Sequence, residues 1–532
     1  MKNKIILFLC LCAIALTHFT ACSTDNESSV SVSEMKRVVK TLASDEFMGR
    51  QPFTEGEKIT IGFLADELHK IGFEAPFEGS YFQKVPMIEI TSKVTEPTLF
   101  KVGKESVYLT SPDEIAINSP QNVKQVSLSG SQLVFCGFGI VAPEYGWNDF
   151  EGVDLKGKTV VVLINDPGLY TNDSSLFRGR EMTYYGRWTY KYEQAAKMGA
   201  DAILIIHESL GAGYEYNVPR KSSITSKLFI DDTTAAPRCK ITGWLPASSA
   251  DLIFGKLGYK VSELRTAACK RGFKPFELKA SFSSVINNEI VKNNSTNVAG
   301  ILKGSSKTGE AIVITAHWDH FGIGEAENGD SIYNGAVDNG TTMAWALEIG
   351  RCFSKLKSKP ERSVILLFPT AEEQGLTGSE YYTEHPIVSM DKTIACLNND
   401  MMVPRGRMKD VTMIGFGYSS LDSLYKEEAL RQERYLLPDP DSHTGLFFRS
   451  DHFPFFKKGV PSIWAMGCFD SREHGQKWAR DGWDDFIKSV YHRPSDNYNE
   501  KWDWAGVAED TKLAFNIANE LTKTTKLRPR LF

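Results

Sequence analysis

The sequence lacks the compositional extremes that mark non-globular or nucleic-acid-binding chains. Its formal net charge is only −5 over 532 residues. It also has no long basic run, so neither nucleic acid nor an anionic membrane surface is indicated as a partner. With 42 glycines and 22 prolines, neither residue is enriched enough to signal disorder or a fibre. Because 42% of the residues are hydrophobic, a large core is available, and the length favours about two to four domains.

Cysteine is sparse, and none of the nine cysteines forms a Cys-x-x-Cys pair. Cys10, Cys12 and Cys22 belong to the N-terminal segment described next. We expect most of the others to be small buried hydrophobic residues, with no disulfide that the sequence can assign. These scattered residues are Cys136, Cys239, Cys269, Cys352, Cys396 and Cys468.

The N-terminal apolar run is too short to cross a bilayer. Lys2 and Lys4 precede this run, which extends from 5 to 16, and the pattern predicts a signal peptide. The following Phe19-Thr20-Ala21-Cys22 resembles the bacterial lipobox, in which the cysteine is acylated. A polar stretch over 23–29 then has the composition of a tether. We therefore expect export as a cell-envelope lipoprotein with a lipid anchor on Cys22, on the periplasmic side or the cell surface. The alternative is ordinary cleavage near Ala21 and secretion of a soluble protein.

Three regions of the remaining chain differ in pattern. Residues 32–73 show helical periodicity, interrupted by Gly49 and Gly72. Residues 119–284 are rich in glycine and contain short apolar runs, which predict the strands of a separate module. From Ser295 onward, long apolar strands alternate with amphipathic helices. This pattern predicts a three-layer α/β/α domain around a mainly parallel sheet.

Three predicted strands of the C-terminal region end directly at acidic or imidazole side chains. The run 311–316 leads to His317 and Asp319, the run 363–369 leads to Glu372 and Glu373, and the run 393–397 leads to Asp400. Ligands gather at the carboxyl ends of strands in open α/β sheets, so these side chains are expected to converge. A histidine with carboxylates is a donor set that zinc uses. His317-x-Asp319 alone is a weak signal, and we take His320 as structural.

Two further acidic features strengthen this interpretation. Asp338 lies just before an amphipathic helix, where a simple N-cap role is the alternative. The adjacent Glu372 and Glu373 follow a buried strand directly, and their like charges would repel each other. A nearby cation would relieve that repulsion.

The sequence resembles the co-catalytic dizinc aminopeptidases, which are related to the glutamate carboxypeptidases and glutaminyl cyclases. The resemblance covers residues 295–532, and residues 119–284 more weakly resemble the protease-associated domain inserted in larger members. It rests on five motifs in order: Thr315-Ala316-His317-Trp318-Asp319-His320, Gly335-Ala336-Val337-Asp338-Asn339, Ala371-Glu372-Glu373-Gln374-Gly375, Asn399-Asp400-Met401 and Tyr491-His492-Arg493-Pro494-Ser495-Asp496.

The resemblance implies the organisation of the chain. Together with the N-terminal pattern, it divides the sequence into a signal peptide over 1–22, a tether over 23–32, the N-terminal part of the peptidase domain over 33–118, an inserted β-rich protease-associated-like domain over 119–284 and the catalytic domain over 285–532.

The resemblance also implies two zinc ions and the residues that hold them. His317 and Asp400 would bind one zinc, Glu373 and His492 the other, and Asp338 would bridge both. Two such cations activate a shared water and polarise the scissile carbonyl.

Three further residues receive catalytic roles from the same resemblance. Glu372, which is not a ligand, would be the general base and pass the proton to the leaving amine. Asp319 would orient His317. Tyr491 resembles the phenol that stabilises the oxyanion, with a packing role as the alternative.

The segment 445–455 resembles the substrate-side loop of the family. It contains Ser450, Asp451 and His452, but consecutive residues rarely form a catalytic triad, so we do not predict one here. Its aromatic residues either line a substrate pocket or belong to the core.

The expected function is a zinc-dependent exopeptidase, most specifically an aminopeptidase that removes N-terminal residues from peptides. A carboxypeptidase is the nearest alternative, and it would need arginine or lysine residues to hold the substrate carboxylate. A glutaminyl cyclase with one zinc and a non-catalytic peptide-binding lipoprotein are also compatible with the sequence. The oligomeric state and the role of the inserted domain stay open at this level.

Overall fold

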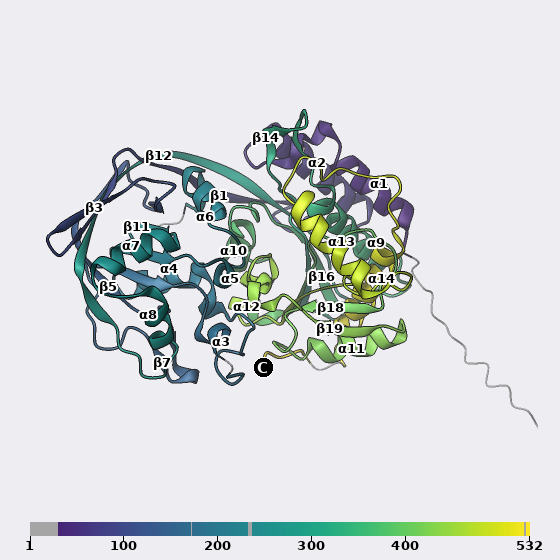
Figure 1. The fold of residues 1–532 in the computed structure, drawn as a ribbon. Helices are drawn as coiled ribbons and strands as arrows, with labels where there is room; N and C mark the ends of the chain where they lie inside the picture. Colours follow the sequence, from purple (N-terminus) through teal and green to yellow (C-terminus); the bar gives the residue numbers. More distant parts are fainter. Residues whose placement is uncertain (1–29, 172, 232–236, 526–527) are drawn as a thin grey trace, which may run out of the picture.

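The computed structural model describes residues 30–171, 173–231, 237–525 and 528–532 (Figure 1). The predicted signal peptide, Cys22 and most of the tether lie outside these residues. Within the described ranges, no helix is both long and apolar enough to span a membrane.

Two lobes lie side by side and are joined by two long antiparallel strands, β1 (Phe82–Val94) and β12 (Phe276–Leu302) (Figure 1). Their pairing runs without interruption from Phe82 with Val298 to Val94 with Ile286. Everything between these strands forms one lobe, which we call the inserted lobe. The helices that precede β1 and the chain that follows β12 form the C-terminal lobe.

The sheet of the C-terminal lobe runs in the order β19-β18-β20-β17-β13-β16-β12. Its central strands β20, β17, β13 and β16 are parallel to one another, whereas β18 pairs antiparallel with β20 and β12 pairs antiparallel with β16. Every residue of β16, β17 and β20 is buried, as expected for strands covered on both faces. These strands are β13 (Lys307–Thr315), β16 (Arg362–Phe368), β17 (Thr393–Asn398), β18 (Asp410–Ile414), β19 (Tyr435–Pro438) and β20 (Ser462–Met466).

Helices cover both faces of this sheet (Figure 1). Helices α9 and α14 pack on one face, and α10 and α12 pack on the other. In α14, Leu513, Ile517 and Leu521 are buried four residues apart, so one stripe of the helix faces the sheet. The helices of this lobe are α1 (Val32–Leu42), α2 (Glu55–Lys70), α9 (Thr342–Ser354), α10 (Thr377–Glu384), α11 (Leu421–Arg431), α12 (His452–Lys457), α13 (Gly475–Ser489) and α14 (Ala505–Thr522), with the hairpin strands β14 (Gly322–Glu327) and β15 (Asp330–Tyr333).

The inserted lobe has its own half of the same continuous sheet, in the order β5-β8-β9-β11-β4. The first four of these strands are parallel to one another. The strands are β2 (Thr98–Val102), β3 (Glu105–Leu109), β4 (Ala116–Asn118), β5 (Gln125–Phe135), β6 (Val141–Ala142), β7 (Trp147–Asn148), β8 (Thr159–Leu163), β9 (Ala202–Ile206), β10 (Lys227–Ile230) and β11 (Ile241–Leu245). The helices are α3 (Pro167–Tyr170), α4 (Trp188–Lys197), α5 (Ser209–Ala212), α6 (Asn217–Ile224), α7 (Ala247–Lys256) and α8 (Val261–Ala268).

The predicted three-layer architecture with a mainly parallel sheet is confirmed. The inserted lobe contains the expected strands, and it also contains helices that were not predicted from its sequence pattern. The domain boundary expected after residue 284 falls inside β12, because one strand serves both halves of the sheet. Five of the six described cysteines are buried and all six are free, as expected for small hydrophobic residues.

Candidate metal centre

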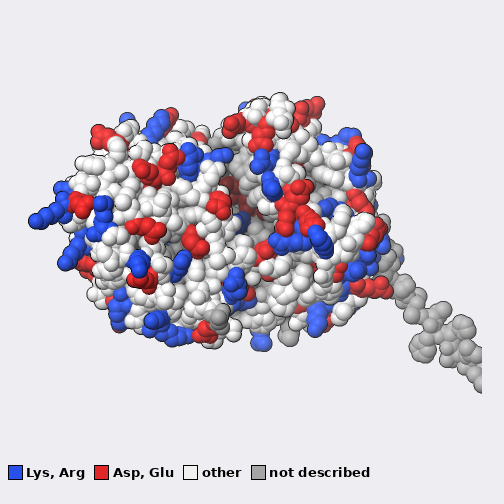
Figure 2. All heavy atoms as spheres, viewed as in Figure 1, with Lys and Arg blue, Asp and Glu red and all other residues white. Residues whose placement is uncertain are grey.

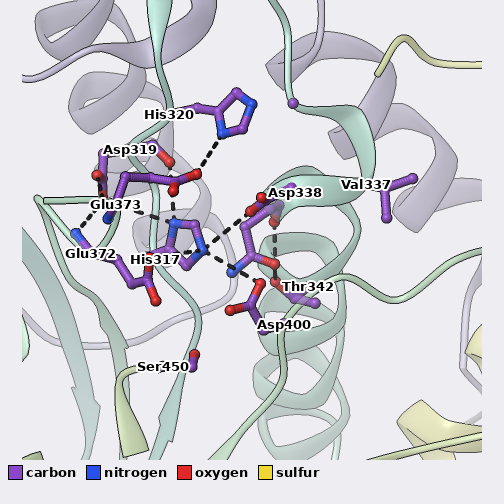
Figure 3. Close-up of polar contacts among 12 residues, drawn as sticks. His317, Asp319, His320, Val337, Asp338, Thr342, Glu372, Glu373, Asp400 and Ser450 are labelled. Atoms are coloured by element: carbon purple, nitrogen blue, oxygen red, sulfur yellow. Dashed lines mark hydrogen bonds and ion pairs between the residues drawn. The ribbon is translucent and has the colours of Figure 1, made fainter. Parts of the chain in front are cut away.

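The predicted ligands come together near the carboxyl ends of the central parallel strands, and Figure 3 shows His317, Asp338, Glu373 and Asp400 there. His317 follows β13 by two residues, Glu373 lies just beyond β16, and Asp400 lies two residues beyond β17. Asp338 lies in a short helical segment (Ala336–Thr341) directly before α9, and His492 lies in the loop that follows α13. Because β16, β13 and β17 are parallel neighbours, their ends bring side chains from distant sequence positions to one place.

The first group consists of His317, Asp338 and Asp400, whose ligand atoms all lie within 4.8 Å of one another. His317 Nε2 lies 3.4 Å from Asp338 Oδ1 and 3.5 Å from Asp400 Oδ1. All three residues are buried. This is the set that the sequence predicted for one metal ion.

The second group uses the other oxygen of Asp338. His492 Nε2 lies 3.2 Å from Asp338 Oδ2 and 3.2 Å from Glu373 Oε2. The opposite oxygen of Glu373 lies 2.8 Å from His320 Nδ1. His320, Asp338 and Glu373 also form a group compatible with a metal ion. Asp338 therefore faces one histidine with each of its oxygens.

Two of these ligand atoms lack hydrogen bonds within the part of the chain that the structure describes, which fits a bound cation. Asp400 Oδ1 and His492 Nε2 are buried polar atoms without a hydrogen-bond partner among the described residues. Such orphaned atoms are uncommon in folded proteins, and a metal ion would use them. Imidazole nitrogens with carboxylate oxygens are ligands that zinc accepts.

The charges of the site are strongly coupled. Burial disfavours ionisation of Asp338 and Glu373, but the surrounding histidines outweigh it and hold the pKa of Asp338 well below its usual value and that of Glu373 at about 2. Burial also opposes protonation of His492, yet Glu373 and Asp338 raise its pKa to about 10. The carboxylates thus form a site that attracts positive charge.

Glu372 is buried beside this site, and its carboxylate does not belong to either candidate ligand group. Its Oε2 lies 4.0 Å from His317 Nε2. Burial raises its pKa well above the usual value, and the charges of Asp400 and Glu373 add to that effect, although His317 opposes it. The residue thus favours its protonated form more than an ordinary glutamate does, as expected of a proton-transfer group.

Asp319 contacts mainly the segment that follows β16, which carries Glu372 and Glu373. Its carboxylate accepts hydrogen bonds from the backbone N–H groups of Glu372 and Glu373. The Nδ1 atom of His317 lies 3.1 Å from the backbone carbonyl oxygen of Asp319 and 3.8 Å from its Oδ1. Asp319 therefore contacts both sequence segments that carry the predicted ligands.

Tyr491 stacks on His492, with ring centroids 3.6 Å apart and planes inclined by 30°. It lines the same cavity as Glu372, Asp338 and Asp400. Burial raises its pKa well above the usual value, and the carboxylates of the site reinforce the effect. Its phenol therefore stays protonated and can donate a hydrogen bond.

Two residues that position Asp338 received no role from the sequence. Arg50 is fully buried, and its guanidinium donates to the carbonyl oxygens of Trp318, Gly335 and Asp338. The carboxylate of Asp496 accepts from the backbone N–H groups of Val337 and Asp338. Asp496 closes the motif that begins at Tyr491, but Arg50 lies far away in the N-terminal segment and gives no local signal.

The backbone between these groups requires glycine at one position. Gly335 has a φ of +55°, and a Cβ atom there would lie 2.1 Å from the carbonyl oxygen of Asp338. Any other residue would push the Asp338 segment out of place. This geometry gives a physical reason for the glycine in the Asp338 motif.

Ser450, Asp451 and His452 do not form a triad. Asn398 Nδ2 donates to Ser450 Oγ at 2.8 Å and lies 3.3 Å from His452 Nδ1, so both side chains contact the end of β17. Phe447, Phe448 and Phe453 pack against one another in the core, and the latter two also line the cavity. The aromatic residues of this loop therefore serve both the core and the cavity wall.

A cavity of about 1420 Å³ lies between the two lobes and contains the predicted site. Asp338, Glu372, Glu373, Asp400 and Tyr491 line it from the C-terminal lobe. Residues of α4, α6 and β10 line it from the inserted lobe. Figure 2 shows the molecular surface hollowed between the lobes, with acidic side chains inside the hollow. The inserted lobe thus forms one wall of the site.

The fold and the site define a class: α/β proteins with a histidine and carboxylate metal site at the carboxyl ends of parallel strands. Residues 297–517 match the model of Peptidase family M28. The prediction of a metallopeptidase domain is thereby confirmed.

Curated relatives match over short stretches. Aminopeptidase NAALADL1 of Mus musculus is 31% identical over 140 residues, which are 25% of this chain and 17% of the mouse protein. Probable glutamate carboxypeptidase LAMP1 of Arabidopsis thaliana is 27% identical over 158 residues, which are 29% of this chain and 20% of that protein. The chain therefore spans a fifth or less of these two relatives.

Similar solved structures include an aminopeptidase from Aneurinibacillus sp. strain AM-1, with a TM-score of 0.49 and 18% identity over 95% of this chain and 96% of that one. Another is the glutaminyl cyclase of Porphyromonas gingivalis, with a TM-score of 0.32 and 20% identity over 42% of this chain and 77% of that one. Both scores lie below 0.5, so these likenesses add nothing to the family match.

Proposed function

We propose that this chain is a zinc-dependent aminopeptidase that holds two zinc ions. The observation that carries the proposal is the position of Asp338, whose two carboxylate oxygens face different histidines, His317 and His492. A bridging carboxylate of this kind suits two cations better than one. His317 and Asp400 would hold one zinc, Glu373 and His492 the other, and Asp338 both. Bound zinc would lower the pKa of a water molecule and polarise the scissile carbonyl group.

Glu372 is the group that moves the proton. It lies beside both ligand groups without belonging to either, and it lines the cavity in which a substrate would lie. Its carboxylate accepts a proton from the attacking water and then passes that proton to the leaving amine.

Tyr491 and Asp319 have two different supporting roles in the reaction. The phenol of Tyr491 donates a hydrogen bond to the oxygen on which negative charge develops when the carbonyl is attacked. Asp319 holds the backbone of Glu372 and Glu373 in place relative to His317.

The names of the relatives support an exopeptidase and differ on the end that is cleaved. The mouse protein is an aminopeptidase, whereas the Arabidopsis protein is a probable glutamate carboxypeptidase. We place the aminopeptidase first because the more similar of these two relatives, at 31% against 27% identity, is named an aminopeptidase, and the cleavage products decide between the two.

The direct test is the release of free amino acids from peptides that are blocked or unblocked at each end, by protein lacking residues 1–22. Trimming of unblocked N-termini supports the proposal, provided that a chelator abolishes it and two zinc ions are bound per chain. Release from the C-terminus would instead indicate a carboxypeptidase. One zinc ion and pyroglutamate formation would indicate a cyclase, and binding without any turnover would indicate a non-catalytic role.

We also propose that the chain is exported and anchored through acylated Cys22. The support is the sequence alone, since this segment lies outside the described residues. Metabolic labelling with a radioactive fatty acid should label the full-length protein and leave a Cys22→Ala variant unlabelled. Labelling of that variant would overturn the assignment of Cys22.

A further inference from the structure

Arg187 is a buried cation in the cavity beside the metal centre. It lies directly before α4 of the inserted lobe and is only 7% exposed. Among the described residues, none forms a hydrogen bond or ion pair with its side chain, and its buried Nε is left unsatisfied. The residue nevertheless lines the cavity that contains Asp338 and Glu372.

A second arginine lies close to it on the C-terminal lobe. Arg449 lines the same cavity, donates to the carbonyl oxygen of Thr444 at 2.6 Å and lies 5.6 Å from the ring centre of Tyr214. Its Nε also lacks a partner within the described part of the chain. Burial lowers the pKa of Arg187 to about 9, and the positive charge of Arg449 contributes to that shift. A Cβ atom on Gly445 would lie 3.2 Å from Arg187 Cδ, and Gly445 directly follows Thr444, whose carbonyl oxygen accepts from Arg449. The two arginine side chains therefore approach the same turn of the chain.

Other buried arginines of this protein are compensated. Arg434 pairs with Asp510 at 2.7 Å, and Arg50 donates to several backbone carbonyl groups. An isolated buried charge is costly, so a folded protein usually pairs it or uses it to bind a ligand of opposite charge. Two adjacent guanidinium groups present a set of N–H donors that suits a carboxylate, which can accept two hydrogen bonds at once.

The position of this pair fits a substrate that also reaches the metal centre. Arg449 directly precedes Ser450, which appears in the close-up of the metal site (Figure 3). Ser450 accepts a hydrogen bond from Asn398 at the end of β17, two residues before Asp400. Both arginines line the cavity that Asp338, Glu372 and Asp400 also line, Arg187 from the inserted lobe and Arg449 from the loop before α12.

We propose that Arg187 and Arg449 together bind a carboxylate group of the substrate, so that the enzyme selects short anionic peptides. This inference rests on the proposed peptidase function and names its substrate class. The carboxylate belongs to the C-terminus of a short peptide or to an acidic side chain, and both present the same chemistry to the two guanidinium groups. The inserted lobe then serves as the wall that recognises the substrate.

The test compares matched peptides as free acids and as C-terminal amides, each with either glutamate or glutamine at one internal position. The enzymes are the wild type, Arg187→Gln, Arg449→Gln and, as a matched control, Arg220→Gln. Arg220 lies in the same lobe outside the cavity wall, and its side chain is 38% exposed.

We expect the wild type to prefer the peptide with the relevant carboxylate by about 10- to 100-fold in kcat/KM, the range of a charge-assisted hydrogen bond. Arg187→Gln and Arg449→Gln should remove most of this preference, mainly through KM, and leave the kcat/KM of the uncharged peptide within about threefold. A merely structural role would reduce turnover of charged and uncharged peptides alike. If kcat/KM falls when the C-terminal acid is replaced by an amide, the bound carboxylate is the C-terminus of the peptide. If kcat/KM falls when glutamate is replaced by glutamine, it is the acidic side chain.

Equal kcat/KM for charged and uncharged peptides in the wild type would overturn the inference while the peptidase function stands. If no peptide is cleaved, the proposed function fails, and calorimetric titration of the zinc-loaded Glu372→Gln protein with the same peptides still tests the inference. Equal affinity for acid and amide would then overturn it. If Arg187→Gln does not fold, the acid and amide comparison in the wild type and in Arg449→Gln remains decisive.

Discussion

The backbone N–H of Glu372 donates a hydrogen bond to the carboxylate of Asp319 over 3.0 Å, which ties the loop after β16 to the end of β13. Asp319 Oδ2 also accepts from the N–H of Glu373 at 3.4 Å. One buried carboxylate therefore holds the segment of the proposed base and of a proposed ligand. Its burial and the nearby charge of Glu373 raise the pKa of Asp319 to about 7, against the opposing effect of His317.

Replacing Asp319 with asparagine should lower peptidase activity without preventing folding. The amide keeps one acceptor oxygen but turns an NH2 group toward a backbone N–H, so the loop after β16 shifts. Loss of such a supporting contact costs about 10- to 100-fold in metal affinity or activity. Steady-state kinetics and zinc titration measure this, with the exposed Asp481→Asn as control. Unchanged kinetics and zinc affinity would show that Asp319 does not position the site.

Glu372→Gln should abolish most of the turnover and leave metal binding intact. Glutamine is nearly isosteric but cannot accept the proton of the attacking water, so kcat should fall by about 10²- to 10⁴-fold. Glu373→Gln is the informative companion, because it should weaken metal binding as well. Metal analysis and kinetics on both variants separate the two roles. A Glu372→Gln protein with nearly wild-type kcat would remove this residue from the mechanism.

Tyr491→Phe should reduce kcat with little change in KM. The substitution removes the phenol hydroxyl and keeps the ring that stacks on His492. Loss of one donor to a developing oxyanion typically costs about 10²- to 10³-fold. Kinetics with a single peptide, together with a melting curve that shows unchanged stability, check this. A drop of less than about twofold would favour the packing role for Tyr491.

The parts of the site that could be predicted are those with a local signal. An apolar run that ends in a histidine or a carboxylate marks the end of a parallel strand, and His317, Glu373 and Asp400 lie near the ends of neighbouring strands. Asp338 carried a weaker signal, because an aspartate before a helix commonly serves as a cap. The prediction of Asp338 as a ligand rested on the order of the five motifs, in which its motif is the second.

The other parts depend on contacts that no local pattern encodes. Arg50 donates to backbone carbonyl groups, which every residue has. Arg187 stands out because its buried Nε has no hydrogen-bond partner among the residues that the structure describes. His320 was taken as structural, yet its ring contacts Glu373, and only the folded chain places them together. The boundary between the two lobes falls within β12, and the sequence does not mark it because the 27 residues of this strand belong to both lobes without a break.

Arg50→Lys should damage the metal centre from a distance. Lysine keeps the charge but has three N–H donors, fewer than the five carbonyl oxygens to which Arg50 donates, so buried carbonyl groups lose their partners. Each unsatisfied group costs about 1–3 kcal/mol, and the melting temperature and the zinc affinity should fall together. Arg37→Lys, on the exposed side of α1, is the matched control. A variant that melts lower but binds zinc as tightly as the wild type would limit Arg50 to a role in stability.

Removal of the metal should destabilise the folded protein through the buried carboxylates of the site. The side chains of Asp338, Glu373 and Asp400 are 3%, 6% and 8% exposed and lie close together, and a cation that binds only the folded chain stabilises it by mass action. At free zinc about a thousand times above the dissociation constant, this contribution is about 4 kcal/mol. Melting curves with zinc and with a chelator should therefore differ for the wild type and for Glu372→Gln, which keeps every proposed ligand. His317→Ala should show a much smaller difference, because it lacks one ligand of the first group. Equal melting temperatures with zinc and with chelator in the wild type would contradict a resident metal at this site.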